Sequence, residues 1–204
     1  NGICSLNAGE DRLTMSCEMH IDRKGRILSY EIFPSVIHVR HRLSYRIVRE
    51  ILVNGDEELA QKYEDVVPML KMMEELCLVL RKKRTTRGAI DFDLPEQKVI
   101  LDEQGRPVEI VQRIRSIAES IIEEFMLAAN ETVARHMFNP KWPFIYRVHD
   151  LPNEEKMKDL AKLLANFNVK LKVSEETKPG EVQKALAELA GKPEERLVSP
   201  GALR

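Results

Sequence analysis

The sequence has few of the residues that build disulfide frameworks or metal sites. Its 204 residues include three cysteines and five histidines. Cys4, Cys17 and Cys77 are far apart and include no Cys-x-x-Cys pair, so the pattern indicates neither a disulfide framework nor a zinc site. Reduced thiols are typical of a cytoplasmic protein, and we therefore expect a cytoplasmic location.

Long apolar runs are also absent. No segment approaches the roughly 18–20 apolar residues that a membrane span requires. The first residues, NGICSLNAGEDR, have no basic stretch leading into an apolar core, which argues against a signal peptide. We expect no membrane association. Because the first residue is Asn rather than Met, we expect the sequence to be an excerpt of a longer chain.

Several motifs that mark nucleotide or hydrolase chemistry do not occur. The sequence contains no Gly-x-x-x-x-Gly-Lys-Ser/Thr, Gly-x-Gly-x-x-Gly, His-Glu-x-x-His or Gly-x-Ser-x-Gly. Two-metal phosphoryl chemistry requires several carboxylates at one point. Asp91 and Asp93 flank Phe92, but an alternating strand would place both on its outer face. No Asp-rich cluster in this sequence offers such a set.

Basic residues form two local clusters, although the formal net charge is −1. The first cluster, HVRHRLSYRIVR at 38–49, surrounds the aromatic Tyr45, and the second, RKKRTTR at 81–87, has five basic residues in seven. Basic side chains beside an aromatic ring suit single-stranded nucleic acid, because phosphates take the charge and bases stack on the ring. A solvated helix end explains the same residues, since Lys and Arg favour the last turn of a helix. Both readings remain open on the pattern alone.

Periodicity predicts an α+β fold in which antiparallel hairpins pack with helices. The apolar residues of 11–22 alternate, which predicts a half-buried strand with Leu13, Met15, Cys17, Met19 and Ile21 on one face. A turn at 23–25 and a strand at 26–39 complete a hairpin, in which Pro34 indicates a bulge or an edge position. A second hairpin is predicted over 89–111, with turn residues 102–105.

Helices are predicted between and after these hairpins. One covers 43–52 and stops at Asn54-Gly55, and a longer one covers 56–83 with an interruption at Pro68. Residues 142–150 read as a short strand, and Asn153 is placed to cap the next helix. Residues 170–179 resemble a linker, and Pro179 and Gly191 bracket one last helix. The terminal SPGALR is not expected to continue it.

The predicted helix over 112–137 contains two polar residues that do not follow its periodicity. Its expected solvated face is formed by Glu124, Glu131 and Arg135. Glu123 and Asn130 lie seven residues apart on another face, which they share with Leu127. Both are therefore predicted to point toward an interior, where a carboxylate needs a partner.

Four strings together resemble a known family. They are CSLNAGEDRLTMSCEMHIDRKGRI, RGAIDFDLPEQKVILDEQGRPVEIV, IIEEFMLAANETVA and PFIYRVHDLPNEEKM. They are similar to the central part of the RNB catalytic domain of the ribonuclease II/ribonuclease R family, and to its ribonuclease R branch in particular. The resemblance covers about residues 3–197 in consistent order, and IEEFMLAAN and RGAIDFDLPE are its most specific strings.

The resemblance implies a processive 3′→5′ exoribonuclease that threads single-stranded RNA and releases nucleoside monophosphates, with Mg²⁺ held by aspartates. It implies that Tyr45 lies near the bound 3′ end, that Phe92 stacks on terminal bases and that Glu123 contacts the terminal nucleotide and shapes base preference. Asn130 is expected to line the same channel, and His149 matches a recurring position without an assigned role.

Each of these residues also has a purely structural interpretation. Phe92 alternates with Ile90, which is typical of a core residue. Tyr45 could cover a junction between a helix and a sheet, and Glu123 could form a structural ion pair. The resemblance favours the functional interpretation for these three residues, whereas Asn130 and His149 stay open between the two.

The family's pattern departs from this sequence in one decisive respect. The magnesium-binding aspartates of the family lie in an Asp-rich motif before the equivalent of Asn1, and further RNA-binding residues follow the equivalent of Val198. We therefore expect a parent exoribonuclease that uses Mg²⁺, and a 204-residue chain that has no catalytic residue and no metal ligand. This chain is expected to bind RNA weakly without cleaving it. The alternatives are a non-catalytic RNA-binding or scaffold module of the same fold, and a partly folded product. We expect a monomer, with the catalytic-domain part at 1–172 and a linker, helix and divergent tail at 173–204.

Overall fold

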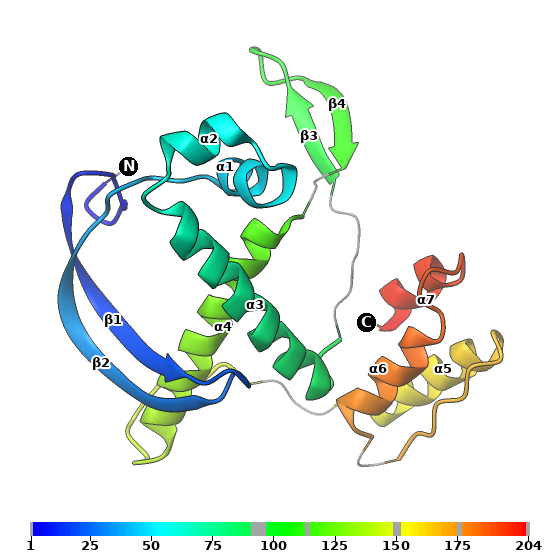
Figure 1. Ribbon diagram of the computed structural model, residues 1–204. Helices are drawn as coiled ribbons and strands as arrows, with labels where there is room; N and C mark the ends of the chain where they lie inside the picture. Colours follow the sequence, from blue (N-terminus) through cyan, green and yellow to red (C-terminus); the bar gives the residue numbers. More distant parts are fainter. Residues whose placement is uncertain (1, 91–96, 113–114, 149–151, 175–176, 203–204) are drawn as a thin grey trace. The chain divides into compact units, whose positions relative to one another are not determined.

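The structure, a computed structural model, describes the chain except residues 1, 91–96, 113–114, 149–151, 175–176 and 203–204. It contains two antiparallel hairpins and several helices, which confirms the predicted α+β fold (Figure 1). The chain divides into two compact units. Unit 1 comprises 1–81 and 115–146, and unit 2 comprises 82–114 and 147–204. The division expected at 172 and 173 remains a prediction.

The first predicted hairpin is present in unit 1. β1 (Asp11–Ile21) pairs antiparallel with β2 (Ile27–His38), so that Leu13 lies opposite Val36 and Met15 lies opposite Pro34. This sheet has two strands, so each strand is an edge that can accept a proline without losing a ladder hydrogen bond on its outer side.

Both hairpins turn through the same Asp-x-x-Gly-Arg sequence, a repeat that the periodicity did not reveal. Asp22 Oδ1 accepts the backbone N–H groups of Lys24 at 2.9 Å and Arg26 at 2.8 Å. Asp102 Oδ1 accepts from the equivalent positions of the second hairpin at 2.9 and 2.8 Å. The glycine of each turn is left-handed, with φ of 73° and 78°, which only glycine adopts without strain. The second hairpin consists of β3 (Gln97–Leu101) and β4 (Pro107–Gln112).

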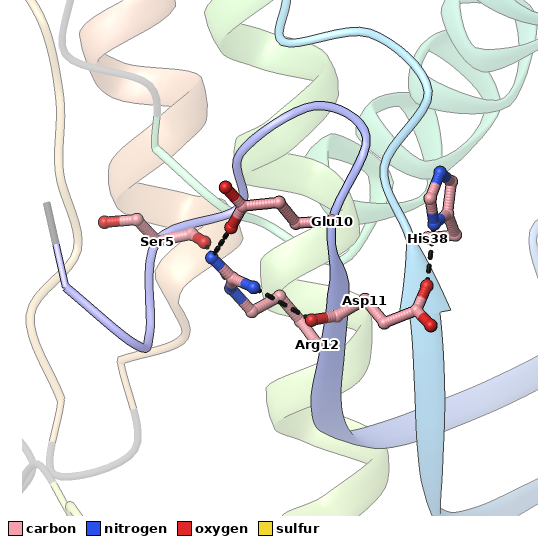
Figure 2. Close-up of polar contacts among 5 residues, drawn as sticks. All are labelled: Ser5, Glu10, Asp11, Arg12 and His38. Carbon is pink, nitrogen blue, oxygen red and sulfur yellow. Dashed lines mark hydrogen bonds and ion pairs between the residues drawn. The ribbon is translucent and has the colours of Figure 1, made fainter.

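Polar contacts tie the N-terminal segment to the open end of the first hairpin (Figure 2). Arg12 donates from Nε to the Ser5 carbonyl at 2.9 Å and forms an ion pair with Glu10. Across the two strands, His38 Nδ1 lies 2.6 Å from Oδ1 of its register partner Asp11. These contacts hold the first residues against the strand ends.

Four helical segments surround the core of unit 1 before its last helix. They are α1 (Tyr45–Arg49), the π-helical η1 (Glu50–Asn54), α2 (Glu57–Lys62) and α3 (Val67–Thr86), whose last turns belong to unit 2. Gly55 ends η1 with φ of 68°, as the Asn-Gly stop predicts. Ile51, Val66 and Leu70 form the buried centre of this group.

The break in the predicted helix over 56–83 lies earlier than expected. α2 ends at Lys62 and α3 begins at Val67, so Pro68 is the second residue of a new helix and does not interrupt an existing one. Proline is tolerated there because the first-turn N–H groups have no intrahelical acceptor.

α4 (Ile117–Phe138) is the last helix of unit 1 and covers one half of the hairpin's apolar face. The Thr132 hydroxyl lies 3.4 Å from Met19 Sδ, and the Tyr30 ring packs edge-on against His136 at 5.7 Å. At the other half, Leu13 is 88% exposed and Met15 is 71% exposed. The predicted half-buried face is therefore correct for the half nearer the turn and wrong for the open end.

The segment predicted as a strand at 142–150 forms no strand over its described part, 142–148. Without a partner strand, its side chains instead make ring contacts. The Tyr146 ring lies 6.2 Å from that of Phe138 and 5.2 Å from that of Phe144, both edge-to-face.

Unit 2 has its own core, built by three helices: α5 (Glu154–Ala165), α6 (Pro179–Ala187) and α7 (Glu195–Ala202). Asn153 caps α5 as predicted, accepting the Glu155 N–H at 2.8 Å. Helix α7 is a correction, because the SPGA segment was expected to be non-helical. The burial of Val198, which is 1% exposed, explains why this segment continues as a helix.

None of the helices in the described part of the chain is both long enough and apolar enough to cross a membrane.

Candidate nucleic-acid interface

Helix α4 carries two of the predicted site residues, and its first turn is strongly fixed. The Ser116 hydroxyl accepts the Ala118 N–H at 3.2 Å, and the Glu119 carboxylate accepts the Ser116 N–H at 3.0 Å. This reciprocal capping box satisfies helix donors that would otherwise lack partners. The capped first turn therefore fixes the helix backbone that carries the later residues of α4.

The faces of α4 agree with the expectation only in part, because Arg135 is exposed as expected whereas two other residues differ. Glu124, expected on the solvated face, is buried at 3% exposure, whereas Asn130, expected to point inward, is exposed. The covered face instead runs through Ile121, Glu124 and Thr132. The error has a physical cause: neighbouring elements cover α4 on the side of Glu124, and local periodicity does not record which side a neighbour occupies.

Glu123 lies at the edge between these faces, with its side chain 32% exposed. It shares the outer side of α4 with Asn130 and with two apolar side chains, Ile122 at 46% and Met126 at 52% exposure. A helix face that combines a carboxylate, an amide and exposed apolar groups can offer both hydrogen bonds and apolar contact to a ligand.

Tyr45 is presented by the first turn of α1. Ser44 caps this helix by accepting the Ile47 N–H at 3.3 Å, and the Tyr45 side chain is 44% exposed. α1 packs against α4, so the elements that carry Tyr45 and Glu123 are neighbours within unit 1. The structure brings the two elements together although 78 residues separate them in the sequence.

The segment that leads into Tyr45 is anchored by Asp65. His41 Nε2 lies 2.9 Å from Asp65 Oδ2, and Arg40 donates to the same carboxylate at 3.3 Å. The hydrogen bond from His41, followed by that from Arg40, lowers the pKa of Asp65. His41 also packs edge-on against Tyr63 at 5.4 Å. These contacts fix the start of α1.

Arg115 is a partner of Glu123 that sequence reasoning missed. It precedes the cap of α4, and its guanidinium Nη2 forms an ion pair with Glu123 Oε2. The only signal in the sequence is a basic residue just before a capping serine, and the pattern does not show that its side chain reaches eight residues ahead.

Two predicted residues, Phe92 and His149, lie outside the described residues. The nearby Ile90 packs against the core of unit 2. Of the predicted site, the structure therefore places Tyr45, Glu123 and Asn130 in unit 1 and leaves the other two untested.

The model of the RNB domain family matches residues 1–204. This chain belongs to the RNB domain family. Ribonuclease R of Aquifex aeolicus is 43% identical over 96% of the chain and 28% of its own length. Ribonuclease R of Thermotoga maritima is 45% identical over 95% of the chain and 27% of its own length. The chain thus spans about a quarter of these relatives.

Solved structures agree with the family assignment. Mycoplasma genitalium ribonuclease R in its apo form matches all of the chain and 32% of its own chain, with a TM-score of 0.91 and 30% identity. The same enzyme in complex with ribose-methylated single-stranded RNA gives a TM-score of 0.90, again at 30% identity over all of the chain and 32% of its own.

The described residues of this RNB chain do not fit a magnesium site. Among them, no group of three or more His, Cys, Asp or Glu side chains lies close enough to hold a metal ion.

The basic clusters of the RNB chain are only partly available to a ligand. In the first, Arg40 pairs with Asp65 and Arg49 pairs with Glu50, whereas Arg42 and Arg46 are exposed. The second occupies the last turns of α3, a position that the helix dipole favours for cations. The helix-end interpretation therefore explains part of both clusters.

Proposed function

We propose that this chain is the central part of the catalytic domain of a 3′→5′ exoribonuclease, and that it contributes a surface for the 3′ end of single-stranded RNA. The observation that supports the proposal is the match of the RNB model over all 204 residues, together with ribonuclease R relatives at 43–45% identity. A cytoplasmic location and a monomeric state are part of the same proposal.

The proposed surface of unit 1 is formed by Tyr45, Glu123 and Asn130, and Phe92, outside the described residues, is proposed as a separate RNA contact. Its support is that α1 packs against α4 and that both Tyr45 and Asn130 are exposed. An exposed ring offers a base a stacking partner, and a carboxylate and an amide accept and donate hydrogen bonds at base and ribose edges.

The 204-residue chain alone is proposed to bind RNA without hydrolysing it. Hydrolysis in this family is expected to need Mg²⁺ on an Asp-rich motif, and the closest pair of aspartates in this sequence is Asp91 and Asp93. The parent protein is proposed to supply the metal-binding carboxylates and to release nucleoside monophosphates. We keep a non-catalytic RNA-binding module as the alternative.

The test uses a fluorescent single-stranded oligoribonucleotide and the 204-residue chain. Anisotropy should show weak binding that falls steeply with salt, because phosphate contacts release counterions. Tyr45→Ala and Phe92→Ala should each weaken binding by about 5-fold to 150-fold, which corresponds to a stacking contribution of about 1–3 kcal/mol.

Phe138→Ala is the matched control, since its ring is 67% exposed in unit 1 and lies outside the proposed surface. Equal losses in Phe138→Ala and Tyr45→Ala would contradict the placement of the site. Release of mononucleotides upon addition of Mg²⁺ would contradict the proposed inactivity of the chain.

A further inference from the structure

The ion pair between Arg115 and Glu123 has a geometry that suggests more than local stability. The two residues are eight apart, further than the three or four residues that normally separate paired side chains on a helix. The Arg115 side chain must therefore extend along the first two turns of α4 to reach the carboxylate. Both side chains remain partly exposed, at 40% and 32%.

We propose that Arg115 is a positioning residue, which holds the Glu123 carboxylate in the orientation that reads the terminal nucleotide. This inference rests on the proposed function, because it assigns the partner of a residue proposed to contact RNA. It adds a residue outside the strings that carry the family resemblance.

The first argument is conformational. A glutamate on an exposed helix face samples several rotamers, and fixing it upon binding lowers affinity. An ion pair that already exists in the absence of RNA fixes the rotamer in advance, so less affinity is lost upon binding. The base of Arg115 is itself fixed, because the next residue, Ser116, is held by the capping box with Glu119. The Arg115 side chain is therefore held at its backbone and paired at its guanidinium.

The second argument is chemical. An ionised carboxylate accepts hydrogen bonds from base N–H and ribose hydroxyl groups. A carboxylate has about four acceptor positions on two oxygens, so the bond from Arg115 Nη2 to Oε2 does not by itself use all of them.

Helix α4 provides a matched control for this pair. Arg135 donates from Nη2 to Glu131 Oε2 at 3.0 Å, in an ordinary pair four residues apart. The Arg135 pair has similar chemistry and lies on the same helix, but it does not include a predicted site residue. Arg135→Met therefore reports the effect of losing one arginine and one ion pair from α4.

The experiment measures base preference, not affinity alone. Dissociation constants are determined for oligoribonucleotides that differ only in the 3′-terminal base, and the ratio between the weakest and the tightest is compared among variants. We expect Glu123→Gln and Arg115→Met each to reduce this ratio by about 3-fold to 10-fold, the effect of one typical hydrogen bond. The double variant should show no further reduction, because the two residues act as one unit.

Arg115→Lys, which keeps the charge, should restore part of the ratio, and Arg135→Met should leave it at the wild-type value. A uniform loss of affinity for all oligonucleotides in Arg115→Met, with an unchanged ratio, would overturn the inference and assign Arg115 to phosphate contact. Additive effects in the double variant would overturn it as well. Absence of RNA binding by the wild-type chain would instead refute the proposed function, and this inference with it.

Discussion

Cys77 is fully buried on α3, and its thiol lies near the buried carboxylate of Glu124 on α4. Burial, and then the negative charge of Glu124, raise the pKa of Cys77 to about 11 from an ordinary value of about 9. The proton is thus held more tightly in the folded state. The resulting stabilisation is present in full below the ordinary pKa and is lost as pH rises from about 9 to about 11.

We predict that Cys77→Ala lowers the free energy of unfolding at neutral pH. The difference in this free energy between wild type and variant should shrink by about 2–3 kcal/mol as pH rises to the raised pKa of the thiol. Urea unfolding of both proteins along a pH series measures this difference, and titrations of other groups cancel in it. Cys4→Ala is the control for the loss of a thiol, because Cys4 is exposed. A pH-independent deficit for Cys77→Ala would show that the thiol titrates normally.

The adjacent residues Glu123 and Glu124 show where prediction from the sequence stops. Periodicity and the family resemblance identified Glu123 as unusual, and the structure places it in an ion pair on a partly exposed face. Periodicity placed Glu124 on the solvated face, but Glu124 is buried, whereas its neighbour Glu123 is partly exposed. The side of a helix that is covered depends on distant residues, here those of α3 and the hairpin, and no local pattern contains that information.

At the scale of elements, the turn of the first hairpin depends on one carboxylate. Asp22 accepts the backbone N–H groups of Lys24 and Arg26 through Oδ1, and Arg26 Nε donates to its Oδ2 at 2.7 Å. The backbone hydrogen bond from Arg26, and then its side-chain hydrogen bond, lower the pKa of Asp22. A lowered pKa means that this stabilisation is complete above the ordinary value and is lost as pH falls through the lowered one.

We predict that Asp22→Asn reduces the loss of stability in acid. The amide oxygen of Asn keeps an acceptor for the turn but has no charge to lose, so the variant should be less stable than wild type near neutrality and should approach it as pH falls below about 4. Circular dichroism along an acid titration gives the comparison. A constant difference between the two proteins at all pH values would contradict the role assigned to the charge.

Elements with strong local signals were predicted well. The hairpin of β1 and β2, the Gly55 stop and the Asn153 cap each follow from residues that act within a few positions of themselves. The helix through SPGA was missed, because proline and glycine disfavour helix and only the burial of Val198 against unit 2 offsets that preference. The absent strand at 142–148 reflects the same limit, since a strand needs a partner.

At the scale of the whole molecule, apolar surface is distributed unevenly within unit 1. α4 covers the part of the hairpin face around Met19 and Tyr30, and the open end carries the exposed side chains Leu13, Met15 and Val36. The register places Leu13 opposite Val36, so these side chains adjoin on one face of the sheet. Adjoining exposed apolar side chains on an edge strand favour association between molecules.

We predict that the double variant Leu13→Thr/Met15→Thr lowers self-association without lowering stability. Thr keeps the strand preference, and side chains that are 88% and 71% exposed contribute little to the core, so the free energy of unfolding should change by less than about 0.5 kcal/mol. Leu70→Ala, at a position 4% exposed, should by contrast cost about 2–5 kcal/mol. Light scattering against protein concentration and urea unfolding measure the two effects. A loss above about 1 kcal/mol in the double variant would mean that this face packs within the chain, and unchanged scattering would mean that association proceeds through another surface.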